Sequence, residues 1–127
     1  MEEAVKPMTL GEFIDALGNL PPCSSVRFDR FGLAPKLSFH SYRGDCGHLQ
    51  MDYKDSGFVR AQQLRIAAIE CVGKEFAGWK GGEYLMDVNT PLYVGRYGDC
   101  TRTMIVRVEG WGSPGYEGAT IYTEQEE

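Results

Sequence analysis

The sequence contains short glycine-rich turns whose side chains suit a small anionic ligand. In "GWKGGEY", residues 78–84, Trp79 can stack on a planar ring and Lys80 can meet a phosphate as a point charge. Gly81 and Gly82 would let the backbone approach such a ligand closely. The alternative interpretation is a plain hairpin turn with a tryptophan that belongs to the core.

Two further turns follow in the second half of the chain. In "NTP", Asn89 can hydrogen-bond a base edge or a ribose, Thr90 adds a hydroxyl, and Pro91 fixes the chain after them. In "YGDCTR", Arg102 emerges where the next strand is expected to begin. With "SYRGDC", described next, "GWKGGEY" and "YGDCTR" make three turns that pair an aromatic residue with a cation. This favours a ligand site, although the sequence does not place the turns together.

The segment "SYRGDC" supplies the remaining turn of this kind. Tyr42 and Arg43 precede a Gly-Asp turn, and the guanidinium of Arg43 can point at a phosphate or carboxylate. An ion pair between Arg43 and Asp45 that merely fixes a hairpin is an equal alternative. The tripeptide Arg-Gly-Asp is interpreted as coincidence, because no secretion signal precedes it.

Residues for catalysis are few. The sequence has no G-x-S-x-G elbow, H-E-x-x-H pair or Walker loop. His40, Cys46 and His48 match no common zinc spacing, and His48 with Asp45 or Asp52 is a weak basis for an acid–base pair. We therefore expect no enzyme activity, no metal and no cofactor.

The charge of the chain limits its partners. The formal net charge of −5 comes from glutamates near the two termini, and the remaining residues balance with 13 basic and 13 acidic side chains. A long nucleic acid needs a broad basic surface, so it is not an expected partner. Eight of the basic residues are arginines, which can hold a small anion with a few guanidinium groups.

The cysteines and the hydropathy pattern indicate a compartment. The four cysteines form no C-x-x-C pair, no basic segment followed by an apolar run precedes the domain, and no apolar run approaches the roughly 20 residues needed to cross a bilayer. We expect a cytoplasmic protein with free thiols and no membrane contact.

Two helices are predicted from apolar spacing. Thr9 and Glu12 form a T-x-x-E capping box before a helix over about residues 10–19, which the two prolines after Leu20 end. A second helix is expected from Val59 to Val72, with Gly73 as its C′ residue. Its sheet-facing stripe is expected to consist of Ile66, Ile69, Val72 and Phe76, with Leu64, Ala68 and Cys71 beside it.

The rest of the chain is divided into short alternating segments. These segments, each bounded by turn residues, predict strands on both sides of the second helix: "SSVRFDRFG", "KLSFHSYRG", "HLQMDY", "EYLMDV", "PLYVGRY", "TMIVRVEGW" and "GATIYTE". The predicted fold is a single α+β domain over residues 1–127, with a curved, mainly antiparallel sheet of six or seven short strands and both helices on one face. Residues 1–8 and 124–127 are expected to be flexible tails.

The order of these motifs resembles a known family. "SYRGD" before a helix, then "FAGWKGGEYLM", "NTPLYV" and "YGDCTR", is similar to the small phage proteins of the first Thoeris anti-defence family. The likeness covers about residues 9–107 and is most specific from Phe76 to Arg102. Members of that family are sponges that bind cyclic ADP-ribose isomers, the messengers of a bacterial TIR-domain defence enzyme, without cleaving them.

The resemblance implies roles for particular residues. Trp79 would stack on adenine, where the family pattern has tyrosine or phenylalanine, and Asn89 would face the ligand. Arg43 and Arg102 would hold the pyrophosphate, whereas Cys46 and Cys100 have no role in the pattern. The implied ligand-binding set is Trp79, Asn89, Arg43, Arg102, Phe76, Lys80, Tyr42 and Thr90.

The resemblance also implies partners. It predicts a homo-oligomer, a hexamer by analogy, that acts in the cytoplasm of the host cell and holds a cyclic nucleotide, with cyclic oligonucleotides as a further ligand class. A pocket shared between subunits would explain how so short a chain closes around a ligand. The competing hypothesis is a small phage inhibitor that binds a host defence protein directly through the same aromatic turns.

Overall fold

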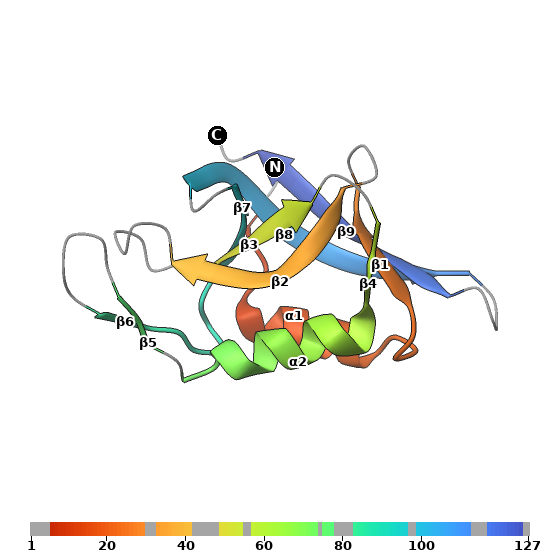
Figure 1. Cartoon of the computed structure of the whole chain (residues 1–127), viewed down its shortest axis with the longest axis horizontal. Coiled ribbons are helices and arrows are strands. Elements are labelled where there is room, and N and C mark those ends of the chain that lie inside the picture. The colour runs from red at the N-terminus through yellow and green to blue at the C-terminus, as the bar shows by residue number, and fades with distance from the viewer. Residues whose placement is uncertain are drawn as a thin grey trace, which may run out of the picture.

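The computed structural model describes residues 6–29, 33–41, 49–54, 57–73, 75–77, 83–96, 99–112 and 117–125. These residues form two helices, a seven-stranded sheet and a separate two-stranded hairpin (Figure 1). The predicted class is therefore confirmed: the chain is an α+β single-domain fold whose sheet stays open.

The sheet mixes antiparallel and parallel neighbours. In spatial order its strands are β2 (Ala34–Ser41), β3 (Leu49–Lys54), β7 (Leu92–Arg96), β8 (Asp99–Trp111), β9 (Gly118–Gln125), β1 (Ser25–Phe28) and β4 (Val59–Arg60). Four of the neighbouring pairs are antiparallel, whereas β3 runs parallel to β7 and β1 runs parallel to β9. The sheet is thus mainly antiparallel, as expected, but it is not a simple meander.

The remaining two strands stand apart from the sheet. β5 (Glu75–Ala77) and β6 (Glu83–Leu85) pair antiparallel and form a small hairpin. Figure 1 shows this hairpin at the left, beyond the end of β2. The segment "GWKGG" that links its two strands includes residues 78–82, which lie outside the described part of the chain.

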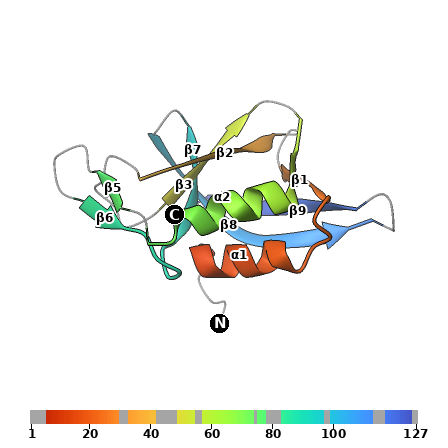
Figure 2. The same cartoon turned by 60° about the horizontal axis from the view of Figure 1, so that its bottom comes forward.

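Both helices cover the same face of the sheet. α1 (Leu10–Gly18) and α2 (Ala61–Cys71) lie side by side beneath it (Figures 1 and 2). A core of fully buried apolar side chains fills the space between the layers. Its largest members are Phe13, Leu10, Leu17, Leu49, Met51, Leu64, Met86, Leu92, Ile105, Ile121 and Val26.

The first helix follows its sequence prediction closely. The Thr9 N–H donates to Glu12 Oε1 at 2.9 Å, and the Glu12 N–H donates to Thr9 Oγ1 at 3.2 Å, so both bonds of the capping box are present. The helix buries Leu10, Phe13, Ile14 and Leu17, the apolar positions expected to face the core.

The second helix begins later than predicted and turns a different face to the core. Its start is corrected from Val59 to Ala61, because Val59 and Arg60 pair with β1 as β4. The stripe expected to face the sheet is wrong: Ile66 is 51% exposed, and Ile69 and Val72 are exposed as well. The buried face consists instead of Ala61, Leu64, Ala68 and Cys71.

The small residues of α2 explain this orientation. Alanine at positions 61 and 68 lets the helix approach its neighbours more closely than a row of isoleucines would allow. Arg65 joins the two helices, since its Nε donates to the Ile14 carbonyl at 3.2 Å and its guanidinium lies against Gly18. Gly73 follows the helix at φ 78°, which confirms the expected C′ glycine.

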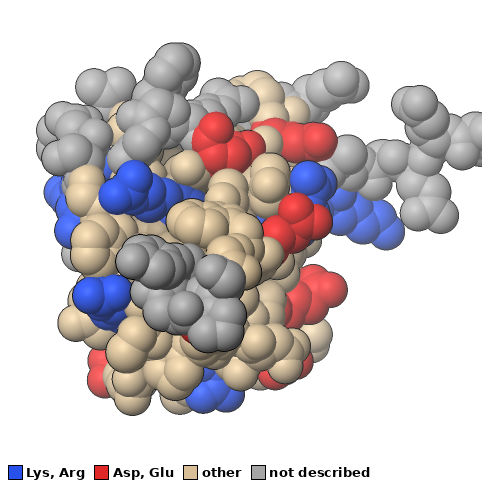
Figure 3. All heavy atoms as spheres, turned by 90° about the vertical axis from the view of Figure 1, so that its right-hand side faces the viewer, with Lys and Arg blue, Asp and Glu red and all other residues tan. Residues whose placement is uncertain are grey.

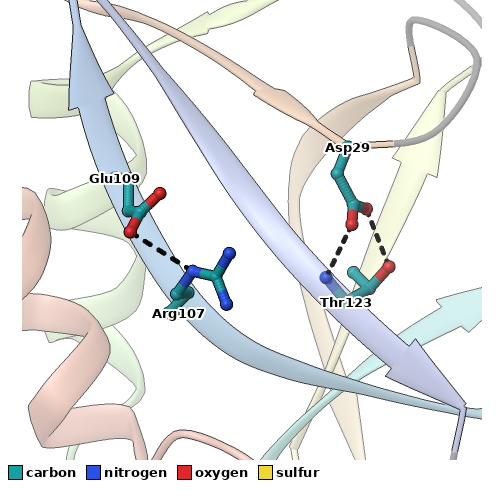
Figure 4. Close-up of polar contacts among 4 residues, drawn as sticks. All are labelled: Asp29, Arg107, Glu109 and Thr123. Carbon is teal, nitrogen blue, oxygen red and sulfur yellow. Dashed lines mark hydrogen bonds and ion pairs between the residues drawn. The ribbon is translucent and has the colours of Figure 1, made fainter.

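The parallel contact between β1 and β9 is held by a carboxylate. Asp29 Oδ1 accepts from Thr123 Oγ1 at 2.8 Å, and Asp29 Oδ2 accepts from the Thr123 N–H at 3.1 Å (Figure 4). In contrast, the Arg107–Glu109 ion pair on β8, at 3.3 Å, is more than half exposed on both sides and contributes little stability.

The expected tails are shorter than predicted. The Met8 N–H donates to the Ile105 carbonyl at 2.6 Å, and the Met8 carbonyl accepts from the Leu92 N–H at 2.9 Å. Glu124 and Gln125 belong to β9. Backbone pairing therefore extends from Met8 to Gln125.

Candidate ligand-binding site

The structure describes some of the predicted site residues in full, some by their backbone alone and some not at all. Tyr42, Arg43, Trp79 and Lys80 lie outside the described residues. Phe76 and Arg102 are placed by their backbones, in β5 and β8. Asn89 and Thr90 are described in full and lie together in the turn that precedes β7.

Asp87 organises that turn. Its Oδ1 accepts from the Asn89 N–H at 2.8 Å, and its own N–H donates to Thr90 Oγ1 at 2.9 Å. The Thr90 hydroxyl lies 3.4 Å from the same Oδ1, and the Thr90 N–H donates to the Asp87 carbonyl at 3.1 Å. Thr90 is buried and holds the turn together, whereas Asn89 is exposed at its tip.

The sequence reasoning did not single out Asp87. An aspartate two residues before an asparagine is a recognisable signal for a turn in which the side chain bonds the backbone N–H two positions on. Read in that way, "DVNT" predicts the observed arrangement, and the role of Thr90 changes from ligand contact to support of Asn89.

The N-terminus of α1 fastens this turn to the rest of the domain. The Leu10 N–H donates to the Thr90 carbonyl at 2.8 Å, and the Gly11 N–H donates to the Val88 carbonyl at 2.9 Å. These N–H groups belong to the first turn of the helix and have no partner within it. The capping box of α1 therefore positions Asn89 indirectly, through the loop that it holds.

Gly11 is required for this close approach. A Cβ at this position would lie 2.9 Å from Val88 Cβ and 3.0 Å from the Val88 carbonyl oxygen, nearer than real side chains come. We expect Gly11→Ala to destabilise the domain by about 1–3 kcal/mol through overpacking, although alanine normally favours a helix. Urea unfolding would measure this change.

Asp15→Ala is a control on the same helix. Asp15 is exposed, and its truncation should change the free energy of unfolding by less than about 0.5 kcal/mol. If Gly11→Ala made the domain more stable, the close packing of Val88 against α1 would be contradicted.

The carboxylate of Asp87 can be tested in the same way. We expect Asp87→Ala to lower the free energy of unfolding by about 1–2 kcal/mol, because the variant loses the side-chain bonds that close the turn. Asp15→Ala, which removes an exposed carboxylate from α1, should change it by less than about 0.5 kcal/mol. Equal effects for the two variants in thermal unfolding would count against the turn.

The described strand ends gather around this turn. The Leu49 N–H, at the start of β3, donates to the Pro91 carbonyl at 2.9 Å, and Leu49 is paired with Ser41 at the end of β2. The Gly73 N–H, after α2, donates to the Met86 carbonyl at 2.7 Å, directly beyond β6. Figures 1 and 2 show the end of β2, the β5–β6 hairpin and the end of α2 at the same end of the domain.

This arrangement brings one of the predicted turns close to another. Ser41 and Leu49, which flank "YRGDCGH", lie next to the turn that carries Asn89. The residues that flank "GWKGG" pair at the tip of the β5–β6 hairpin, whereas the base of that hairpin leads into the Asn89 turn. Arg102 lies on β8 between Cys100 and Thr103, which pair with the last part of β7. The backbone of Arg102 is therefore one strand removed, across β7 from β3.

Other site classes find no support in the described geometry. Within the described ranges, no group of three or more histidine, cysteine or acidic side chains could hold a metal ion. The His40 side chain, Cys46 and His48 lie outside them, whereas Asp52 is buried on β3. Of the cysteines that the structure describes, Cys23 is exposed and Cys71 is buried, and both are free thiols.

No helix among the described residues is long and apolar enough to pass through a membrane. Comparison of the chain with protein-family models, with curated proteins and with solved structures gives no match. The geometry thus defines an α+β domain in which the turn that carries Asn89 lies beside the adjoining ends of β2 and β3 and follows β6.

Proposed function

We propose that this protein binds and sequesters a cyclic nucleotide signal, an isomer of cyclic ADP-ribose, without cleaving it. The observation that carries the proposal is the convergence at one end of the domain. There the paired end of β2 and β3, at Ser41 and Leu49, lies beside the turn that presents Asn89, and β6 leads directly into that turn. The family that the motif order resembles supplies the ligand class.

The residue types of the proposed set match such a ligand. An indole at Trp79 suits the face of adenine, and Asn89 suits a base edge or a ribose hydroxyl. Guanidinium groups at Arg43 and Arg102 suit a pyrophosphate, which two planar forks can hold bidentately. Phe76, Lys80 and Tyr42 complete the proposed set, with Thr90 in the supporting role described above.

The proposed activity needs no catalytic group. A sponge acts by competing with an effector for a scarce messenger, so it must bind tightly and bury most of the ligand. A single small domain offers little enclosing surface, and we therefore propose that subunits of a homo-oligomer, a hexamer by resemblance, share the pocket. The proposed place of action is the cytoplasm of the host cell.

One experiment separates the possible activities. The purified protein is incubated with cyclic ADP-ribose isomers, the free ligand is measured, and the protein is then denatured by heat before the supernatant is analysed by mass spectrometry. Depletion followed by recovery of intact messenger is the expected result. An altered product would instead indicate an enzyme, and no depletion of any isomer would overturn the proposal.

A second candidate function is favoured by one feature of α2. Ile66 and Ile69 on this helix and Val72 directly after it are exposed apolar residues, which suits contact with another protein. If no nucleotide is depleted, direct binding of a host defence protein becomes the better explanation. Substitution of Ile66 and Ile69 by serine would then abolish inhibition while leaving the fold intact by circular dichroism.

A further inference from the structure

A surface tryptophan at the opposite end of the domain is held in a fixed position. Trp111 ends β8 and is 56% exposed, yet its Nε1 donates to Thr120 Oγ1 on β9 at 3.1 Å. Gly118 is its cross-strand partner, and a Cβ on Gly118 would overlap the indole ring. The glycine therefore makes room for one face of the indole, and the strand pair holds a large aromatic surface toward solvent.

A hollow of about 520 Å³ lies beside this tryptophan. Its other walls include Phe58, which precedes β4, and the side chains of Arg27 on β1 and Arg60 on β4. Glu117 contributes a carboxylate to the lining. A volume of this size lies within the range of small-molecule sites.

The two arginines are arranged around the phenylalanine. The guanidinium carbon of Arg60 lies 4.9 Å from the centre of the Phe58 ring, and that of Arg27 lies 6.0 Å from it. Arg60 Nη1 also donates to the Cys23 carbonyl at 2.8 Å, which fixes the guanidinium. Because a guanidinium carries five N–H donors, one such bond leaves donors to meet an anion.

Backbone contacts fasten the loop that carries Cys23, a residue of the lining, to the start of α2. The Ala61 N–H donates to the Ser24 carbonyl at 2.9 Å, and the Gln62 N–H donates to the Pro22 carbonyl at 3.0 Å. These two N–H groups of the first helical turn therefore have loop carbonyls as partners. Figure 3 faces this side of the molecule and shows basic side chains at its left, at its lower edge and at its right, and acidic ones mostly toward its right.

We propose that this hollow is a second ligand site, which binds a planar aromatic ring that carries an anionic group, of the size of a mononucleotide. The ring would stack on the open face of Trp111, and the anion would meet Arg27 and Arg60. A purely apolar ligand would desolvate the Arg27 guanidinium and the remaining donors of Arg60 without offering them an acceptor, and a bare anion would leave the indole uncovered. The proposal is independent of the site that contains Asn89, because that turn precedes β7, which pairs with Asp99–Met104 of β8, whereas Trp111 is the last residue of β8.

Binding at the hollow can be measured by tryptophan fluorescence in the Trp79→Phe variant. The chain has two tryptophans, so Trp111 is the one that remains in this variant. Three probes are titrated: adenosine 5′-monophosphate, adenosine and inorganic phosphate. We expect saturable quenching by adenosine monophosphate, and binding of the other two at least about tenfold weaker, since each makes half of the contacts. The absence of saturable quenching by adenosine monophosphate at millimolar concentration would overturn the proposal.

Substitution in the same background assigns the anion contact. We expect Arg27→Gln to weaken adenosine monophosphate binding by about tenfold, because it loses a charge-assisted contact. Arg107→Gln is the matched control: it removes an exposed arginine that stacks on Tyr122, 4.1 Å away, outside the hollow. Equal affinities for these two variants, both folded by circular dichroism, would overturn the proposal.

Cys23 provides a second, local readout. Its thiol is exposed and lines the hollow, so a bound ligand should shield it. We expect saturating adenosine monophosphate to slow alkylation of Cys23 by iodoacetamide several-fold, as measured by peptide mapping. An unchanged rate of alkylation would overturn the proposed second site. It would leave the proposed function standing, because that function is tested separately by depletion of cyclic ADP-ribose isomers.

Discussion

Trp79→Ala is expected to weaken binding of the cyclic ADP-ribose isomer by about ten- to a hundredfold, because stacking of a base on an aromatic ring contributes about 1–3 kcal/mol. If the indole acts on the ligand and not within the core, the free energy of unfolding should change by less than about 1 kcal/mol. Isothermal calorimetry measures the affinity, and urea unfolding measures the stability.

Asp15→Ala is the control for this variant. It removes an exposed side chain of α1 that lines neither proposed site, and should leave affinity for the cyclic messenger unchanged. A loss of several kcal/mol of stability in Trp79→Ala would instead assign Trp79 to the core. Equal affinities for Trp79→Ala and wild type would remove the stacking role.

Leu64→Ala and Ile66→Ala are expected to differ sharply, although the two residues are close neighbours on α2. Leu64 is completely buried, and its truncation should lower the free energy of unfolding by about 2–5 kcal/mol through lost contacts and a cavity. Ile66 is 51% exposed, and its truncation should change stability by less than about 0.5 kcal/mol. Chemical denaturation of both variants tests which face of the helix packs on the sheet.

If Ile66→Ala were instead the more destabilising of the two variants, α2 would pack on the sheet through Ile66 and Ile69, as predicted from the sequence. A substantial loss in Ile66→Ala that grows with protein concentration would point to a different cause, namely burial of the Ile66 row between subunits. The measurement is therefore made at two concentrations. An oligomer of the kind proposed above would be detected in the same series by light scattering.

Local features of the fold could be predicted well. The capping box at Thr9 and Glu12, the helix that follows it and the glycine after α2 are specified by residues within one or two turns. Hydrophobic alternation likewise identified β1, where Val26 and Phe28 are buried and Arg27 is exposed. These elements are determined by residues that are close together in the sequence, so their signals are local.

The orientation of α2 shows where such a reading fails. Two apolar rows run along this helix, and periodicity favoured the row with the larger side chains, at Ile66 and Ile69. The fold buries the row with alanines instead, because α2 packs closely against α1 through Arg65 and Gly18. Such a preference depends on the partner surface, which the hydrophobic pattern of one helix does not contain.

The candidate site was predicted in part for a similar reason. Residue types alone selected Asn89, but the carboxylate of Asp87 that holds its turn was overlooked. The parallel pairing of β3 with β7, which brings Leu49 beside Pro91, is a long-range contact without a local signal. The hollow beside Trp111 was missed because it combines residues from three separate regions of the chain.

The parallel pairing of β1 with β9 has a consequence for how the protein is made. β9 lies between β8 and β1 in the sheet. The pair formed by β1 and β4 therefore cannot join the rest of the sheet until Gly118–Gln125 has left the ribosome. Such non-local pairing slows folding, and the growing chain meanwhile exposes apolar surface that chaperones recognise. A premature stop before Gly118 is therefore expected to cost the cell the entire domain and not just its last strand.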